Sequence, residues 1–153
     1  MKKNNSIIIG SGVIGGYLAK LLLSKKQKVI VTSRRAKKSY TNYSKLNIEN
    51  KIIFEELDVL KKEDILKLLK KYTPKNIFYF SGQSSLTKSI KLKKITNDSN
   101  YIGAKKILEI LHKYKLKTNF YKANSGYILE PKKGFVNIKS KISKNKNPYI
   151  PVS

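Results

Sequence analysis

The sequence predicts an α/β fold, in which a parallel sheet is flanked by helices. Two observations lead to this expectation: apolar runs of strand length alternate with segments of helical spacing, and a glycine-rich turn joins the first such pair. Strands that alternate with helices form βαβ units, in which the strands lie parallel. Right-handed crossovers then bring a ligand to the carboxyl ends of the strands.

Each element follows from its apolar pattern. Strands are predicted where apolar runs are short and nearly continuous, at 6–9, 28–32, 52–57, 77–80 and 119–123. Helices are predicted where apolar residues recur every three or four positions, at 13–24, 61–72 and 95–114. In the last helix, the residues expected to face the core are Ile102, Ile107, Leu108 and Leu111. The polar stretch 33–50 has tyrosine and leucine at helix-like spacing, and the chain turns irregular after Glu130.

The glycine-rich turn directly follows a strand and opens a helix. The first glycine permits the tight turn, the second lets backbone approach a pyrophosphate, and the third allows close packing of helix and strand. The helix N-terminus adds free N–H groups. We therefore predict a Rossmann-type site for a nicotinamide dinucleotide, with an ordinary glycine-rich turn as the alternative. The expected pyrophosphate-binding residues are Gly10, Ser11, Gly12, Val13, Ile14 and Gly15.

The end of the second strand decides which dinucleotide is expected. A site for NAD requires Asp or Glu there to bind the ribose hydroxyl. This chain has Ser33, Arg34 and Arg35 instead, and these are its only two arginines. We therefore predict NADP, whose 2′-phosphate the arginines would bind, with NAD as the alternative cofactor. A pair of solvated surface cations is the structural alternative.

Two further loops complete the predicted cofactor site. After the third strand, Asp58 and Val59 are expected at the adenine, where the carboxylate can accept a hydrogen bond from the amino group; an N-cap for the helix near residue 61 is the alternative. After the fourth strand, Ser81, Gly82 and Gln83 are expected to let backbone come close to the cofactor, and a plain polar loop is the alternative.

Composition excludes several classes of site. The chain has no cysteine and a single histidine, so neither a disulfide framework nor a cysteine or multi-histidine metal site is expected. His112 is expected to be a surface histidine favoured by the helix dipole. The run of isoleucines at 7–9 is far shorter than a signal-peptide core, and no segment approaches a membrane span, so a cytoplasmic protein without membrane contact is expected.

The net charge of +25 invites a nucleic-acid interpretation, which we discount. Of 34 basic residues only two are arginine, and the lysines are spread along the chain beside abundant isoleucine and asparagine, as A/T-rich codons would supply. Readers of bases and phosphates rely on arginine because its planar fork binds bidentately. No nucleic-acid partner is expected, although the positive field would favour a dianionic nucleotide.

These residues resemble the extended short-chain dehydrogenase/reductases that act on nucleotide sugars, most closely the GDP-mannose 4,6-dehydratase family. The resemblance begins in the first helix (15–22), the arginine pair (34–35) and the acid after the third strand (57–58). It continues in the polar loop (83–84), the fourth helix (96–104) and the last strand with its hydroxyl residues (120–125). It implies an NADP-dependent lyase or epimerase with a nucleotide-sugar substrate. It also implies that Ser125 is a catalytic residue, which hydrogen-bonds the sugar's 4-hydroxyl while a Tyr-x-x-x-Lys pair further on does acid–base work.

The chain departs from the family in three places. Ile9 stands where the family has its first glycine, and Tyr127 stands where the dehydratase has a catalytic glutamate, which puts water elimination in doubt and makes an epimerase or reductase plausible. The segment 148–153 resembles the one just before the catalytic tyrosine, and the chain stops there. The resemblance therefore implies a truncated sheet, with the family's Tyr/Lys pair and sugar-binding region absent.

The predicted organisation is a NAD(P)-binding domain over 1–130 and an irregular segment over 131–153 that leads to the absent region. The favoured hypothesis is the NADP-binding part of a nucleotide-sugar dehydratase or epimerase, inactive alone because acid–base catalysis typically contributes about 10²–10⁴-fold. The alternative is a standalone non-catalytic NADP-binding or scaffold module. A basic RNA-binding or membrane-surface protein is the third hypothesis. The residues leave open a homo-oligomer or a second chain that completes the fold.

Overall fold

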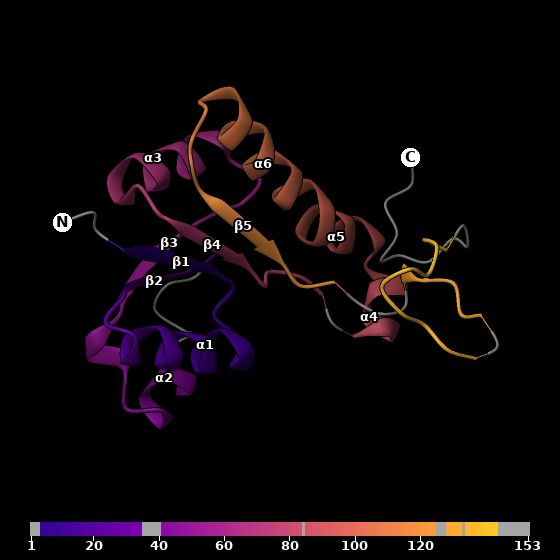
Figure 1. The fold of residues 1–153 in the computed structure, drawn as a ribbon, viewed down its shortest axis with the longest axis horizontal. Helices are drawn as coiled ribbons and strands as arrows, with labels where there is room; N and C mark the ends of the chain where they lie inside the picture. The colour runs from indigo at the N-terminus through magenta and orange to yellow at the C-terminus, as the bar shows by residue number, and fades with distance from the viewer. Residues whose placement is uncertain (1–3, 35–40, 84, 125–127, 133, 144–153) are drawn as a thin grey trace.

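The computed structural model describes residues 4–34, 41–83, 85–124, 128–132 and 134–143. Strands and helices alternate along them in the predicted order (Figure 1). The strands are β1 (Asn5–Ile9), β2 (Lys28–Ser33), β3 (Ile53–Glu56), β4 (Asn76–Tyr79) and β5 (Asn119–Lys122). The helices are α1 (Val13–Ser24), α2 (Thr41–Lys45), α3 (Lys62–Tyr72), α4 (Leu86–Lys91), α5 (Lys93–Asn97) and α6 (Gly103–Lys113), with a 3₁₀ turn η2 (Glu49–Lys51) and a π-helical turn η3 (Asp98–Ile102).

All the strands run parallel in one sheet with the order β3-β2-β1-β4-β5. Ile8 in the central strand pairs with Val31 of β2 on one side and Phe78 of β4 on the other. Helices α1 and α2 lie against one face of the sheet, and α3 and α6 lie against the other (Figure 1). The predicted Rossmann-type α/β fold is confirmed.

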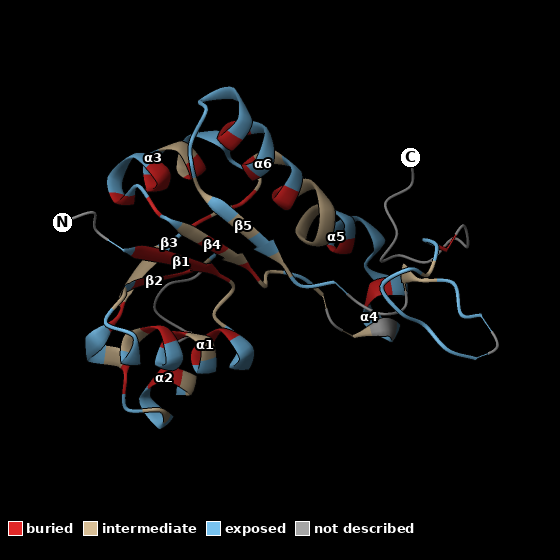
Figure 2. Ribbon diagram, in the orientation of Figure 1, coloured by how far each residue is buried: buried red, intermediate tan, exposed pale blue. Residues whose placement is uncertain are grey.

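Helices on both faces explain the continuous apolar runs of the central strands, such as Ile7 to Ile9 of β1 and Val29 to Val31 of β2. Every residue of β1 is buried, and Figure 2 shows this strand buried along its length. Ile7 and Ile9 pack into the core beneath α3 and α6, whereas Ile8 packs into the core beneath α1 and α2. Strands buried on two faces carry near-continuous apolar runs rather than an alternating pattern, as the sequence indicated. The buried polar residues Asn5, Ser6 and Thr32 flank these runs.

Helix α3 illustrates how local sequence and packing agree. Its apolar residues Ile65, Leu68, Leu69 and Tyr72 recur at helical spacing and are all buried. Acidic residues occupy its first turn and lysines its last, which is the arrangement that the helix dipole favours. The helix ends after Tyr72, next to the proline at position 74.

Three features of the helices differ from expectation. The predicted helix 95–114 is a continuous helical segment in which α5 passes through the π-helical turn η3 into α6. Leu108 was expected in the core, but its side chain is 48% exposed, because it lies on the flank of α6 that no described element covers. Helix α4 was not predicted; its N-cap Ser85 accepts a hydrogen bond from the N–H of Lys88.

The described residues after β5 form no regular strand or helix, as the irregular composition indicated. Isolated bridges join Leu129 to Ile142 and Lys132 to Phe135. In the described part of the chain, no helix is both long enough and apolar enough to cross a membrane.

Candidate functional site

The loops that carry the predicted site meet at the edge of the sheet where the strands end, here called the carboxyl edge. The N–H of Gly10 donates to the carbonyl of Thr32 at 3.1 Å, so the turn after β1 lies against the end of β2. The N–H of Phe80 donates to the carbonyl of Ile9 at 2.8 Å and joins the end of β4 to the same turn. The parallel register thus gathers segments that are distant in sequence.

Two of the three glycines in the turn are required by the fold itself. Gly10 has a φ of +108°, and a Cβ there would lie 2.8 Å from the backbone of Phe80 and of Ser81. A Cβ on Gly15 would lie 2.6 Å from the carbonyl oxygen of Gly10. These glycines let α1 and β4 pack closely against the end of β1.

Gly12 is different, because the fold does not require it. Its φ is −69°, which any residue adopts, and a Cβ there would meet no atom within 4 Å. The glycine therefore keeps a space open above the start of α1. Backbone that is free of side chains at such a point can be approached closely by a phosphate.

The start of α1 is electrically suited to an anion. Its N-cap Gly12 supplies no side-chain hydrogen bond, and its first turn has no acidic residue. The first four N–H groups of a helix have no partner inside the helix, and the dipole places about half a positive charge there. Val13 and Ile14, the first two residues of the helix, are 59% and 67% exposed. This turn can therefore present N–H donors and apolar surface to a dinucleotide.

The end of β2 lies directly beside the glycine turn. Ser33 is the last residue of β2, and its carbonyl accepts a hydrogen bond from the N–H of Leu57 at 3.0 Å. Arg34 comes next with an exposed side chain and forms no salt bridge with any described residue. Arg35 lies outside the described residues. An exposed arginine, rather than an acidic residue, thus directly follows the end of β2.

The acid after β3 folds back on its own loop. One carboxylate oxygen of Asp58 accepts a hydrogen bond from the N–H of Leu60 at 2.9 Å. The N-cap of α3 is Lys61, so the alternative that Asp58 caps this helix is wrong. A carboxylate has further acceptor capacity, and Asp58 is partly exposed, whereas Val59 is buried.

The loop after β4 is held by a residue that the sequence interpretation did not single out. Asn100 in η3 accepts a hydrogen bond from the N–H of Gln83 at 2.8 Å, and its amide donates to the carbonyl of Gln83 at 3.4 Å. A Cβ on Gly82 would collide with the side chain of Asn100. Ser81 and Gln83 are partly buried, and Gly82 is exposed. The only signal for Asn100 in the sequence is a polar residue inside a helix near Gly103.

Burial shifts the pKa of two side chains near the carboxyl edge. Burial raises the pKa of Tyr79 to about 12, against a smaller lowering by a hydrogen bond with Ser81. The Tyr79 hydroxyl donates to the carbonyl of Ser99 at 2.5 Å. Lys122, at the end of β5, has its pKa lowered by burial, and it donates a hydrogen bond to Asn124. Tyr79 therefore stays neutral at physiological pH and joins β4 to η3.

The predicted catalytic Ser125 lies outside the described residues. So does Tyr127, which stands where the resemblance expects a catalytic glutamate. Tyr101 and Lys105 carry a Tyr-x-x-x-Lys spacing that the sequence interpretation did not single out. The Lys105 ammonium lies 5.9 Å from the centre of the Tyr101 ring. This pair is on the helical segment before β5, whereas the family resemblance expects the catalytic pair after it. His112 is exposed in the last turn of α6, as predicted.

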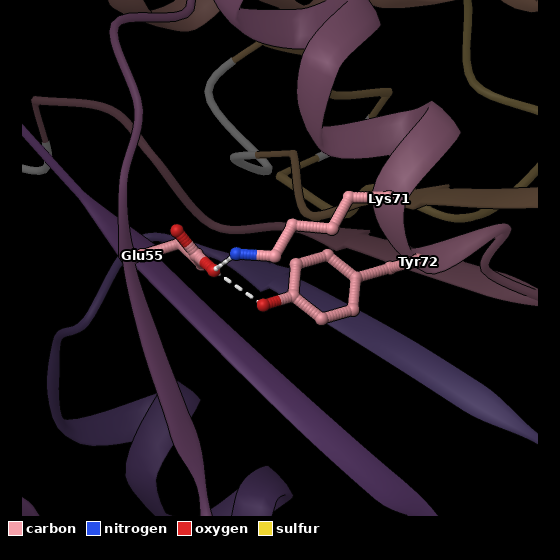
Figure 3. A network of polar contacts seen from close by, with 3 residues as sticks. All are labelled: Glu55, Lys71 and Tyr72. Carbon is pink, nitrogen blue, oxygen red and sulfur yellow. Dashed lines mark hydrogen bonds and ion pairs between the residues drawn. The ribbon is translucent and has the colours of Figure 1, made fainter.

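A separate polar cluster joins α3 to the edge strand β3 (Figure 3). The ammonium of Lys71 lies 2.6 Å from a carboxylate oxygen of Glu55, and the hydroxyl of Tyr72 donates to the same oxygen. Burial raises the pKa of Glu55, but hydrogen bonds from Lys71 and Tyr72 and the charges of Lys71 and Lys67 outweigh it, so the net pKa is lowered. The cluster fastens a helix to the sheet. Across the described residues, no group of three or more histidine or acidic side chains could hold a metal ion.

Comparison with known proteins gives a consistent picture. The family model described as GDP-mannose 4,6 dehydratase matches residues 7–128. CDP-paratose 2-epimerase of Salmonella typhi is 30% identical over 111 residues, which are 72% of this chain and 33% of that protein. The chain thus spans about a third of the length of this curated relative.

Solved structures share the fold. The UDP-Glc/GlcNAc 4-epimerase from Campylobacter jejuni matches with a TM-score of 0.82 and 18% identity, over 95% of this chain and 44% of that one. UDP-glucose 4-epimerase from Brucella ovis, solved in complex with NAD, matches with a TM-score of 0.80 and 20% identity, over 95% of this chain and 43% of that one. Similarity at this level of identity establishes the architecture alone.

Proposed function

The chain belongs to the GDP-mannose 4,6 dehydratase family, and from this premise we propose that it is the part of a nucleotide-sugar dehydratase or epimerase that binds NADP. The single observation that carries the proposal is the open space at Gly12, a glycine that the fold does not require, directly above the start of α1. An anionic group that approaches the backbone there explains the glycine. The family match independently supports a nicotinamide cofactor and a nucleotide-sugar substrate.

The pyrophosphate of the cofactor is assigned to the turn from Gly10 to Gly15. The N–H groups of the first turn of α1 would donate to the phosphate oxygens, and the helix dipole would stabilise their negative charge. Ser11 would add a hydroxyl, and the exposed side chains of Val13 and Ile14 would be covered by the bound nucleotide. None of these groups has to move far, because the glycines already fix the turn.

NADP is proposed over NAD because of the residues at the end of β2. Ser33 and Arg34 are next to the glycine turn, and Arg34 is exposed without a salt-bridge partner among the described residues. An arginine binds a phosphate through two parallel hydrogen bonds. Arg35 is proposed as a second phosphate ligand. The structure of the Brucella relative contains NAD, so NAD is the alternative that a binding experiment must separate.

The remaining contacts are assigned by position on the carboxyl edge. Asp58 and Val59 are proposed at the adenine, where the free carboxylate oxygen would accept a hydrogen bond from the amino group. Ser81, Gly82 and Gln83 are proposed beside the central part of the cofactor, on the loop that Asn100 holds. When bound, the nicotinamide ring would supply hydride transfer. Ser125 is proposed to hydrogen-bond the sugar's 4-hydroxyl.

The names of the relatives, a CDP-paratose and two UDP-sugar epimerases, support a nucleotide sugar as the substrate class. We propose that the chain by itself has little activity. The support for this is that its one Tyr-x-x-x-Lys spacing, Tyr101 with Lys105, precedes β5 rather than following it. The domain over 1–130 would then bind the cofactor, and the segment 131–153 would lead toward the catalytic region.

Fluorescence titration of the purified chain with NADPH and with NADH tests the cofactor proposal. Arg34→Glu should weaken NADPH binding by about 10–100-fold, since a charged hydrogen bond is worth about 1.5–3 kcal/mol. NADH binding should change far less. Lys113→Glu, at the far end of α6, makes the same change in net charge and should leave NADPH binding nearly unaltered. If Arg34→Glu weakens NADPH and NADH equally, the assignment of the 2′-phosphate is wrong.

A further inference from the structure

The loop between β3 and α3, residues 57–61 and here called the β3–α3 loop, is closed by hydrogen bonds within itself. One carboxylate oxygen of Asp58 accepts from the N–H of Leu60 at 2.9 Å, and the carbonyl of Asp58 accepts from the N–H of Lys61 at 3.0 Å. The second carboxylate oxygen accepts no hydrogen bond from any described residue. The turn therefore fixes one oxygen of Asp58 and leaves the other for a ligand.

Helix α6 holds this loop through a lysine. The ammonium of Lys106 donates to the carbonyl of Leu60 at 2.5 Å, although the two residues are 46 positions apart in the sequence. Among the described residues, no backbone N–H donates to this carbonyl, and Lys106 forms no salt bridge. The side chain of Lys106 is partly buried, whereas that of its neighbour Lys105 is exposed. The ammonium of Lys106 is thus directed at the loop rather than at solvent.

Gly103 brings α6 close enough for this contact. A Cβ there would lie 2.6 Å from a methyl group of Val59, which is buried in the core beneath the helix. Residues three positions apart lie on the same face of a helix, so Gly103 and Lys106 meet the β3–α3 loop together. Helix α6 therefore holds the loop at Val59 and Leu60, the two residues that directly follow Asp58.

We propose that Lys106 is a positioning residue for recognition of the cofactor's adenine. By binding the carbonyl of Leu60, it keeps the β3–α3 loop in the turn that presents the free oxygen of Asp58 to the adenine amino group. In this role Lys106 touches neither the base nor the phosphates and acts through the loop. Lys106 has this role only if Asp58 contacts adenine, so the inference rests on the proposed function.

Two nucleotides measure the selectivity for adenine: NADPH and its hypoxanthine analogue, in which a carbonyl replaces the 6-amino group. A carboxylate can accept a hydrogen bond from an amino group but not from a carbonyl. In fluorescence titrations, the wild-type chain should bind NADPH about 10–100-fold more tightly than the analogue, which is the usual effect of one hydrogen bond to a charged group. This ratio of affinities is the preference for adenine.

Variants of the full chain test whether Lys106 sets this preference. Lys106→Met removes the ammonium but keeps an unbranched apolar chain, and it should reduce the preference about 2–10-fold. Lys106→Arg keeps a donor for the carbonyl of Leu60 and should retain most of the preference. Lys105→Met is the matched control, because it removes the same charge from the neighbouring exposed residue and should leave the preference unchanged.

A double variant tests whether Lys106 acts through Asp58. In Asp58→Ala the preference for adenine should already be lost. Adding Lys106→Met to this variant should then have no further effect on the preference, because residues that act through one another are not additive. A further fall in the preference, as large as in the wild-type background, would show that Lys106 acts on the base by another route and would overturn the proposal.

Circular dichroism establishes which variants are folded, and Lys106→Gln replaces Lys106→Met if the latter is not. If Lys106 acts on the phosphates or on the site in general, Lys106→Met would weaken both nucleotides equally and leave the preference at its wild-type value. That result would overturn the proposal, as would a wild-type chain that binds both nucleotides equally tightly. In either case NADPH binding, and with it the proposed function, would stand. A wild-type chain that binds neither nucleotide would contradict the proposed function as well.

Discussion

Asn100 holds the loop after β4 in place through Gln83, whose N–H donates to the Asn100 side chain at 2.8 Å. Asn100 sits in the π-helical turn η3, and such turns are often found at functional sites. The hydrogen bond therefore couples the helical segment before β5 to the edge of the sheet where the cofactor is proposed to bind.

Asn100→Ala should weaken NADPH binding by about 2–10-fold, because one hydrogen bond contributes about 0.5–1.5 kcal/mol to the order of this loop. Fluorescence titration measures the change. Asn97→Ala is the matched control, since Asn97 is exposed one turn earlier in the same helical segment. Equal NADPH affinity in wild type and Asn100→Ala, with both folded, would show that the loop does not contact the cofactor.

Tyr43→Phe should stabilise the protein by about 1 kcal/mol. The Tyr43 side chain is fully buried under the glycine turn, its hydroxyl has no hydrogen-bond partner among the described residues, and burial raises its pKa to about 12. Removal of an unpaired buried hydroxyl relieves a desolvation cost. Urea denaturation measures the gain, and Tyr114→Phe, at a half-exposed site, should be neutral. A loss of stability in Tyr43→Phe would mean that the hydroxyl has a partner.

The cluster of Glu55, Lys71 and Tyr72 should make the free energy of unfolding fall as the pH becomes acidic. The pKa of Glu55 is lowered from 4.5 in the folded chain, so its contribution is present above the unfolded value and is lost as the pH falls through the folded value. Glu55→Gln should therefore lower the free energy of unfolding by up to about 1 kcal/mol at neutral pH and by almost nothing well below pH 4.5. The effect at neutral pH is small because the pair with Lys71 is partly exposed.

Thermal unfolding of wild type and Glu55→Gln across this pH range checks the expectation. Glu56→Gln is the control, since it removes the same charge from an exposed residue of the same strand that forms no salt bridge with a described residue. A difference between wild type and Glu55→Gln that stays constant with pH would contradict the assigned role.

Gly103→Ala should destabilise the protein although alanine favours helix. A Cβ at Gly103 would lie 2.6 Å from the Tyr79 hydroxyl and from a methyl group of Val59. Overpacking costs about 1–3 kcal/mol, which outweighs a gain of about 1 kcal/mol in helix propensity. A Cβ in Gly16→Ala, in α1, would lie 3.1 Å from the flexible end of Leu46 and in ordinary contact with Asn42 at 3.9 Å, so this variant should be neutral or stabilising. Urea denaturation of both variants decides between these outcomes.

Much of the fold was predictable because it depends on patterns that local sequence carries. The bounds of α1 were predicted to the residue, and β1, β2 and α3 differ by one residue at an end. Buried parallel strands need continuous apolar runs such as Ile7 to Ile9, and a helix on their face needs recurring apolar positions. Both patterns are easy to recognise in the sequence where the strands lie in the middle of the sheet and are buried on both faces.

The remainder depends on contacts that are distant in sequence. Leu108 has the spacing of a core residue, and only the place of α6 at the end of the sheet leaves it exposed. Asn100 is one polar residue in a long helix until β4 brings Gln83 beside it. The role of Gly12 could be inferred from its place in the motif, but only the structure separates it from Gly10 and Gly15, which packing requires.

The most direct test of the account is the affinity of a Gly12→Val variant for NADPH, measured by fluorescence titration beside its melting temperature. The substituted side chain enters open space at an ordinary φ, so stability should change by about 1 kcal/mol or less. NADPH binding should fall by more than about tenfold, because the side chain occupies the place of the pyrophosphate. A folded Gly12→Val variant that binds NADPH as tightly as wild type would contradict the account.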